Sequence, residues 1–181
     1  MNVLVTLGQV YIPGWVKKRA FSELFDSTAE AFRCPVPPIK GLSLEQRLRQ
    51  YALFTQSHAA EALQDGGDVA AVQERLYENA YRLGARYRRW LRVRTIEDVM
   101  ATGRILYRVL GIEFEGNAQG DVVIRRCFFS AFYSSEVCQV MSAMDRGVFA
   151  GLSGGSQLVF SARITEGHNC CQATLHPPAG L

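Results

Sequence analysis

The hydrophobic pattern of the chain changes its period once, at Gly111, and no other sequence feature constrains the fold as strongly. Before Gly111, apolar residues recur every three or four positions, which is the period of an α-helix with one buried face. From Ile112 onward, short apolar or alternating runs rich in β-branched residues are separated by glycine-containing turns. The sequence therefore predicts an α+β fold, in which a helical N-terminal half packs on a small antiparallel sheet with one further helix.

Capping and breaking signals divide the first part into four predicted helices. Pro13 suits a first helical turn, and Ser43 with Gln46 three residues later forms a capping box. Asp68 and Thr95 are further N-cap residues, each followed by an amphipathic run. The predicted helices are residues 13–33, 43–63, 68–91 and 95–111.

Two hairpins and one helix are predicted after residue 111. Residues 116–120 and 167–169 read as turns between strands, and Ser134 and Ser135 are natural N-caps for a helix between the hairpins. The predicted strands are residues 112–116, 121–127, 157–164 and 170–175, and the helix is 135–151. Residues 1–12 are predicted to be a strand or a leader, and the tail 176–181 to be loose.

Length and composition fit one globular domain over residues 1–181, mainly helical over 13–111 and with sheet plus helix over 112–176. The formal net charge is only +3, from 20 Lys and Arg against 17 Asp and Glu, so no nucleic-acid partner is expected. No run reaches the roughly 18 apolar residues of a membrane span, and the start lacks a basic leader. We therefore expect a cytoplasmic protein without a membrane partner, acting alone or as a small oligomer such as a homodimer.

The region from Cys127 to Cys171 holds four of the five cysteines. An odd number of cysteines without an export signal predicts reduced thiols rather than a disulfide framework. Cys138 lies near the start of the predicted helix, where the helix dipole favours a thiolate. Asp145, seven residues later, lies on nearly the same helix face among apolar residues, so a buried carboxylate there would need a partner.

Less specific interpretations of these residues stay open. A free cysteine often packs as a small apolar residue, and Asp145 could lie on a solvated face beside Arg146. His168, in the turn before Cys171, could be a surface residue or a catalytic one. Cys127, Cys138, His168 and Cys171 could in principle bind zinc, but no paired metal-ligand spacing supports this, and no metal or cofactor is predicted.

These residues also carry a resemblance to a known family. Cys127, Cys138, Asp145, the stretch 164–167 and Cys171, with their spacings, resemble the L-2-amino-thiazoline-4-carboxylic acid hydrolase family over about 50 residues. Residues 145–151 with 167–171 also resemble four-vinyl-reductase-like domains, which are small-molecule-binding modules. His168 stands where an acidic residue is usual in those domains.

The first resemblance implies a hydrolase that opens a cyclic amidine to an N-carbamoyl amino acid. Asp145 would accept a proton or orient the amidinium, Cys138 would be a nucleophile or an acid, and His168 is a further catalytic candidate. Substrate-binding candidates are Cys127, Cys171 and three arginines that could hold a carboxylate, namely Arg125, Arg126 and Arg163. The second resemblance implies a pocket that binds a small molecule without turnover.

Overall fold

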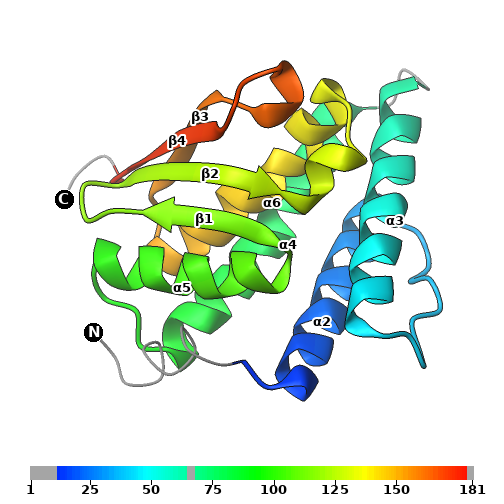
Figure 1. The fold of residues 1–181 in the computed structure, drawn as a ribbon, viewed down its shortest axis with the longest axis horizontal. Coiled ribbons are helices and arrows are strands. Elements are labelled where there is room, and N and C mark those ends of the chain that lie inside the picture. The colour runs from blue at the N-terminus through cyan, green and yellow to red at the C-terminus, as the bar shows by residue number, and fades with distance from the viewer. Residues whose placement is uncertain (1–11, 65–67, 179–181) are drawn as a thin grey trace.

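Four helices precede the first strand of the described chain and α6 lies between β2 and β3, and the helices are packed beside an antiparallel sheet (Figure 1), so the predicted α+β fold is confirmed. The computed structural model describes residues 12–64 and 68–178. The helices are α2 (Gly14–Phe32), α3 (Leu44–Gln64), α4 (Val69–Trp90), α5 (Ile96–Val109) and α6 (Ser135–Ser153). The strands are β1 (Ile112–Gly116), β2 (Asp121–Cys127), β3 (Gln157–Ala162) and β4 (Cys171–His176), and two 3-10 turns, η1 (Phe128–Ala131) and η2 (Ile164–Glu166), follow β2 and β3.

The sheet joins the two predicted hairpins in the order β1-β2-β4-β3, and every neighbouring pair is antiparallel. The predicted ranges of β1 and β2 are confirmed. β3 was expected to continue to Ile164 and instead ends at Ala162, after a register shift between Phe160 and Ala162. The chain then turns through η2, which brings Ile164 and Thr165 inward to the cavity described below.

The predicted caps determine where the helices begin. Thr95 and Asp98 form a reciprocal capping box at α5, and Asp68 accepts a hydrogen bond from an amide of α4. Ser134 does the same for α6. The C-terminal end of α6 was predicted at Gly151, but the helix continues to Ser153 and ends at Gly154, which adopts a left-handed φ of 87°.

Gly151 lies inside α6 and not at its end. Its lack of a side chain allows α6 to pack closely against α4. A Cβ atom on Gly147 would lie 2.2 Å from the carbonyl oxygen of Tyr77, and one on Gly151 would lie 2.3 Å from that of Tyr81. Gly84 of α4 makes the reciprocal approach to α6. The backbones of the two helices are therefore in direct contact, which fixes the position of α6.

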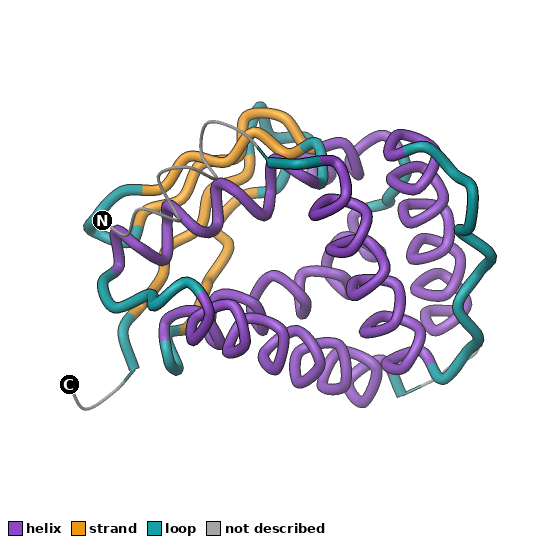
Figure 2. The backbone as a smooth tube through the Cα atoms, turned by 90° about the horizontal axis from the view of Figure 1, so that it is seen from below, coloured by secondary structure: helices purple, strands orange, loops and turns teal. Residues whose placement is uncertain are grey.

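α2 and α3 run side by side, with α2 packed on α4 and α3 on α6, and α6 also contacts β3 of the sheet (Figures 1 and 2). α5 packs along β1, and its aromatic side chain Tyr107 meets Phe114 and Phe149 in the core. A second apolar cluster lies where α2, α3, α4 and α6 meet. This arrangement leaves the inner face of the sheet opposite α2 and α3.

Two predictions for the chain ends have different outcomes. The strand or leader expected at residues 1–12 lies outside the described residues except for Ile12. At the other end His176 is not loose, because it closes β4 opposite Gln157. Within the described residues, no helix is both long enough and apolar enough to cross a membrane.

Candidate functional site

A cavity of about 150 Å³ lies between α2 and α3 on one side and α5, α6 and the sheet on the other. Most of its lining is aliphatic or aromatic, with polar groups concentrated along α6 and around η1 and η2. Such a combination of an apolar wall and a few convergent polar groups is typical of small-molecule sites. Representative apolar lining residues are Leu24 of α2, Tyr51 of α3, Leu106 of α5, Ile124 of β2, Phe129 of η1 and Phe160 of β3.

One stripe of α6 supplies the polar wall of this cavity. Cys138, Ser142 and Asp145 are spaced by four and three residues, so they follow one face of the helix, and all three line the cavity. The opposite face of α6 carries Gly147 and Gly151 against α4. The expected alignment of Cys138 and Asp145 is therefore present, and its orientation is fixed by the helix contact behind it.

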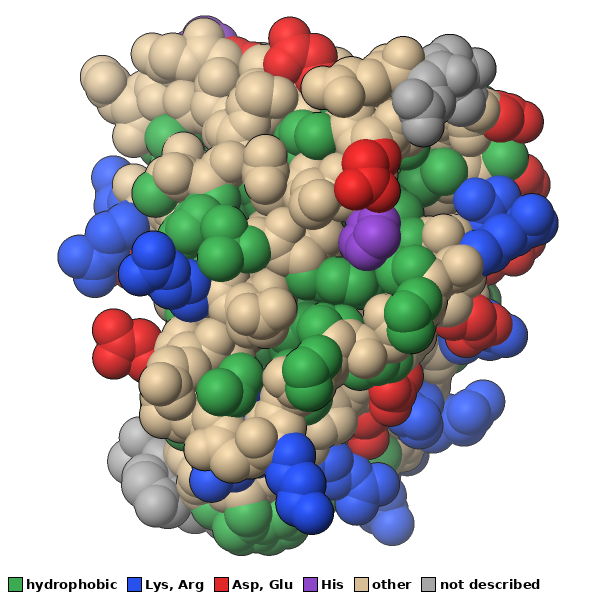
Figure 3. Space-filling view, turned by 90° about the vertical axis from the view of Figure 1, so that its right-hand side faces the viewer, with side chains coloured by type: hydrophobic (Ala, Val, Ile, Leu, Met, Phe, Trp, Pro, Cys, Tyr) green, Lys and Arg blue, Asp and Glu red, His purple; other side chains and the backbone are tan. Residues whose placement is uncertain are grey.

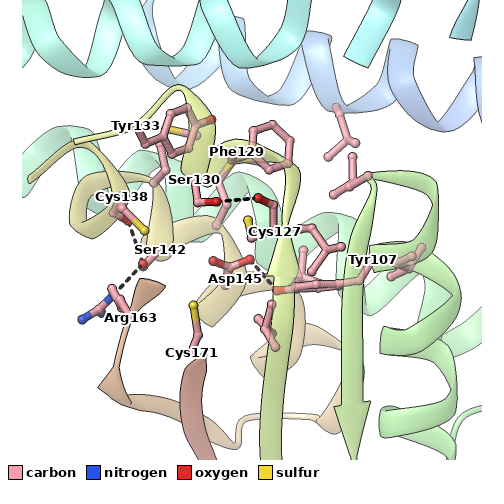
Figure 4. Close-up of a pocket in the computed structure, with 18 of the residues that line it drawn as sticks. Tyr107, Cys127, Phe129, Ser130, Tyr133, Cys138, Ser142, Asp145, Arg163 and Cys171 are labelled. Atoms are coloured by element: carbon pink, nitrogen blue, oxygen red, sulfur yellow. Dashed lines mark hydrogen bonds between the residues drawn. The ribbon is translucent and has the colours of Figure 1, made fainter. Parts of the chain in front are cut away.

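Asp145 accepts a hydrogen bond from the phenolic hydroxyl of Tyr107 (Figure 4). Burial raises the pKa of Asp145 to about 6, although Tyr107, Arg163 and Arg146 each oppose the increase. Asp145 is half-buried and lines the cavity. Asp145 is therefore mostly ionised at neutral pH, and Tyr107 is the only residue of the described chain that donates a hydrogen bond to its carboxylate.

Tyr107 remains a hydrogen-bond donor because its own pKa is raised well above the ordinary value, first by burial and then by the charge of Asp145. The sequence interpretation missed this residue. A tyrosine within the apolar face of the fourth helix was a usable signal, because a buried phenol needs a hydrogen-bond partner. The same signal applies to Tyr51 and Tyr133, whose hydroxyls pair with Thr28 and Thr55.

Three of the predicted thiols, those of Cys127, Cys138 and Cys171, line the cavity around Asp145 (Figure 4). Burial raises the pKa of Cys127 to about 12 and also raises the pKa values of Cys138 and Cys171. The expected thiolate character of Cys138 is therefore not found. Desolvation raises the pKa of Cys138 more than Thr165, Arg163 and Ser142 lower it, and the backbone amide of Cys138 is already bonded to the carbonyl oxygen of Ser134.

Arg163 lies at the edge of the cavity and is held from three sides. Its Nε donates to Ser142 Oγ at 3.4 Å, its Nη1 lies 3.2 Å from Glu166 Oε1, and its guanidinium stacks over Phe160. Thr165 next to it has a buried hydroxyl, whose interaction with the thiol of Cys138 lowers the pKa of that thiol against the effect of burial. Arg163 is thus the one arginine among the three predicted substrate-binding arginines that lines the cavity.

The structure places His168, Arg125 and Arg126 outside the cavity. His168 is exposed in the turn before β4. Arg125 pairs with Glu115 and Arg126 with Glu113, and both arginines are exposed because a register shift between β1 and β2 at this point interrupts the alternation of side chains along β2. The candidate site therefore consists of Cys127, Cys138, Asp145, Arg163 and Cys171, with Tyr107 and Ser142 added.

All five cysteines are free thiols. In the described part of the chain, no three His, Cys, Asp or Glu side chains are arranged to hold a metal ion. The three thiols of the cavity are therefore separate groups on its wall.

No protein-family model matches the chain, and no curated protein matches it. Among solved structures, the chain is similar to a crystal structure of trafficking protein particle complex subunit 3 from Naegleria fowleri, which is covalently bound to palmitic acid. The match has a TM-score of 0.46 and 15% sequence identity, and it covers 72% of this chain and 96% of that chain. Any function must therefore be argued from the cavity itself.

Proposed function

We propose that the chain binds a small molecule with an apolar body and a cationic nitrogen, and that the nitrogen pairs with Asp145. The observation that carries the proposal is an ionised carboxylate, with Tyr107 as its one hydrogen-bond donor in the described chain, on the wall of an apolar cavity. A carboxylate can accept about four hydrogen bonds, so most of its capacity is left for a ligand. A positive ligand group would also compensate the cost of burying this charge.

The cavity limits the size of the ligand. An engineered apolar cavity of about 150 Å³ holds one benzene molecule, and the volume found in this chain is also about 150 Å³. A single ring with one amine or amidine group therefore fits. An amidinium is favoured over a simple ammonium because its planar pair of N–H groups matches the two oxygens of a carboxylate.

Binding of benzamidine, measured by isothermal titration calorimetry, tests this proposal. Benzamide has nearly the same shape without the charge, so it should bind at least about tenfold more weakly. Asp145→Asn should remove most of this difference. Glu113→Gln serves as the matched control, because it removes an exposed carboxylate from the outer face of the sheet. Equal affinity for benzamidine and benzamide in the unmodified protein would contradict the proposal.

Hydrolysis of a cyclic amidine is a second candidate, favoured by the pKa of Asp145 near 6. A carboxylate of this kind can accept the proton of a water molecule that attacks the amidine carbon. With 2-amino-thiazoline-4-carboxylate, addition of water at that carbon and cleavage of its bond to sulfur would give N-carbamoyl-cysteine. The departing sulfur takes a proton and becomes a free thiol. The protonated thiols of Cys138 and Cys171, which line the same cavity as Asp145, are the candidate proton donors.

Release of a new thiol from 2-amino-thiazoline-4-carboxylate tests this second candidate. Asp145→Asn should lower turnover by roughly 10²-fold or more, whereas Glu113→Gln should not change it. Cys138→Ser, which is expected to keep the fold by circular dichroism, should lower turnover if its thiol is the proton donor. A flat trace with the unmodified protein would remove the hydrolase and leave the binding proposal intact.

A further inference from the structure

The start of α2 and the end of α4 lie at the same end of the molecule, because the two helices are antiparallel. Arg86 of α4 pairs with Glu23 of α2 at 2.9 Å, whereas toward the other end Arg75 donates to the carbonyl oxygen of Ala31 at 2.7 Å. Residues that precede Glu23 on α2 therefore lie at the same end of the molecule as residues that follow Arg86 on α4. We call this region the basic end and define it by Trp15, Lys18, Arg89, Trp90, Arg92 and Arg94.

The four cations of the basic end are exposed and uncompensated. Lys18, Arg89, Arg92 and Arg94 form no ion pair within residues 12–64 and 68–178. The segment 1–11 contains no Asp or Glu that could neutralise them. Figure 3, which views the right-hand side of the molecule in Figure 1, shows exposed lysine and arginine side chains along the lower part and at both edges of that face. The net charge of the whole chain is only +3, so it does not indicate that unpaired cations are concentrated at one end of the molecule.

The basic end also presents both tryptophans of the chain to solvent. Trp15 is 70% exposed and Trp90 is 63% exposed, and the sequence contains no other tryptophan. Tryptophan is enriched where proteins meet the headgroup region of a membrane, because its ring is apolar and its N–H is polar. Clusters of lysine and arginine are attracted to anionic lipids over roughly a Debye length.

We propose that the basic end binds the surface of a membrane that contains anionic lipids. The cations contact lipid phosphates and carboxylates, and the two indoles enter the headgroup layer. Contact of this kind needs no membrane-spanning helix, so the proposal departs from the expectation of no membrane partner, which was based on the absence of a spanning run. Single-stranded nucleic acid fits less well, because it requires a groove lined by aromatic side chains, whereas the two tryptophans project from separate helix ends and neither lines a pocket found in the described chain.

Sedimentation with lipid vesicles and tryptophan emission, both measured on the full chain, test this proposal. Vesicles of two parts phosphatidylcholine to one part phosphatidylserine should bind the protein, and pure phosphatidylcholine should not. Because every tryptophan lies at the basic end, a shift of the emission to shorter wavelength reports on this surface alone. High salt should reverse both signals.

The double variant Arg89→Gln, Arg94→Gln should weaken binding by at least about tenfold, since each cation near an anionic surface contributes about fivefold. Arg125→Gln with Arg126→Gln is the matched control, because it removes the same charge from exposed positions of β2. Circular dichroism checks that both variants are folded. The proposal would be overturned by an equal loss of binding in the two variants, by equal binding to pure phosphatidylcholine, or by no binding to vesicles. Binding of a single-stranded oligonucleotide in place of vesicles would instead assign the basic end to nucleic acid.

Discussion

Tyr107 of α5 and Asp145 of α6 are joined by a hydrogen bond at the wall of the cavity, 38 positions apart in sequence. Each of the two groups shifts the pKa of the other. The phenol lowers the pKa of the carboxyl group, and the carboxylate helps to keep the phenol protonated. At neutral pH this pair therefore presents a negative charge whose position is set by two helices.

Binding of a cation to the cavity should depend on pH through Asp145. Because its pKa is about 6, the carboxylate is charged above pH 6 and is progressively neutralised below it. The affinity for benzamidine should therefore be constant near pH 8 and fall toward tenfold per pH unit below pH 6. Calorimetric titrations across this range measure the midpoint, and an affinity that does not change between pH 5 and 8 would contradict the role of Asp145.

Tyr107→Phe should move that midpoint to higher pH. The substitution removes the hydrogen bond that favours the ionised carboxylate, so the pKa of Asp145 rises above its present value near 6. Tyr51→Phe is the matched control, since its hydroxyl also lies at the cavity but pairs with Thr28. The same titrations measure both variants, and an equal shift in both would show that the effect is not specific to Tyr107.

Asp145→Asn should stabilise the protein at neutral pH. The folded state raises the pKa of Asp145 from near 3.8 to about 6, so the folded state binds the proton more tightly than the unfolded state. Below pH 4 the carboxyl group is protonated in both states and does not lower the stability of the fold. As pH rises from 4 to 6, the free energy of unfolding falls by about 1–3 kcal/mol in total because of this group. Urea denaturation should show a variant more stable than the unmodified protein at pH 7, with the advantage gone at pH 4.

Gly147→Ala should destabilise the protein by about 1–3 kcal/mol, despite the better helix propensity of alanine. The added Cβ would lie 2.2 Å from a carbonyl oxygen of α4, so the two helices would have to separate. Gly14→Ala is a useful contrast, because nothing lies within 4 Å of its Cβ position and the change should be neutral or stabilising. Midpoints of urea denaturation compare the two, and similar values would argue against the close helix contact.

The cavity thiols should be alkylated slowly. With a pKa of about 12, roughly one in ten thousand Cys127 side chains is ionised at pH 8, and only the thiolate reacts. Iodoacetamide labelling followed by mass spectrometry should therefore show that Cys127 is alkylated at least about a hundredfold more slowly in the folded than in the unfolded chain.

Without reduction, all five thiols should be titratable after denaturation, and a count below three would contradict the predicted reduced state.

The sequence was most informative where local signals decide the structure. The caps at Ser43, Asp68 and Thr95 act within one helical turn, so their effect on the helix starts could be predicted. The end of α6 could not, because Gly151 is required by the distant helix α4 and not by a turn. Glycine indicates a helix end or a close contact equally well, and only tertiary structure separates these possibilities.

The candidate site shows the same division. Helical spacing correctly aligned Cys138 with Asp145, because both belong to one helix. Spacing could not identify Tyr107 as the partner of Asp145, since that contact depends on how α5 packs on the sheet. It also could not separate Arg163 from Arg125, because a shift in the register of β3 and the turn η2 bring Arg163 to the cavity.

The contact between α4 and α6 also restricts how this cavity could change during evolution. Because α6 is fixed by backbone contact at Gly147 and Gly151, the position of Asp145 cannot drift without loss of stability. The opposite wall, including Leu24 and Leu106, is built from side chains that can be exchanged singly. Changes in the shape of the cavity would therefore arise by substitutions in α2 and α5, while Asp145 stayed in place.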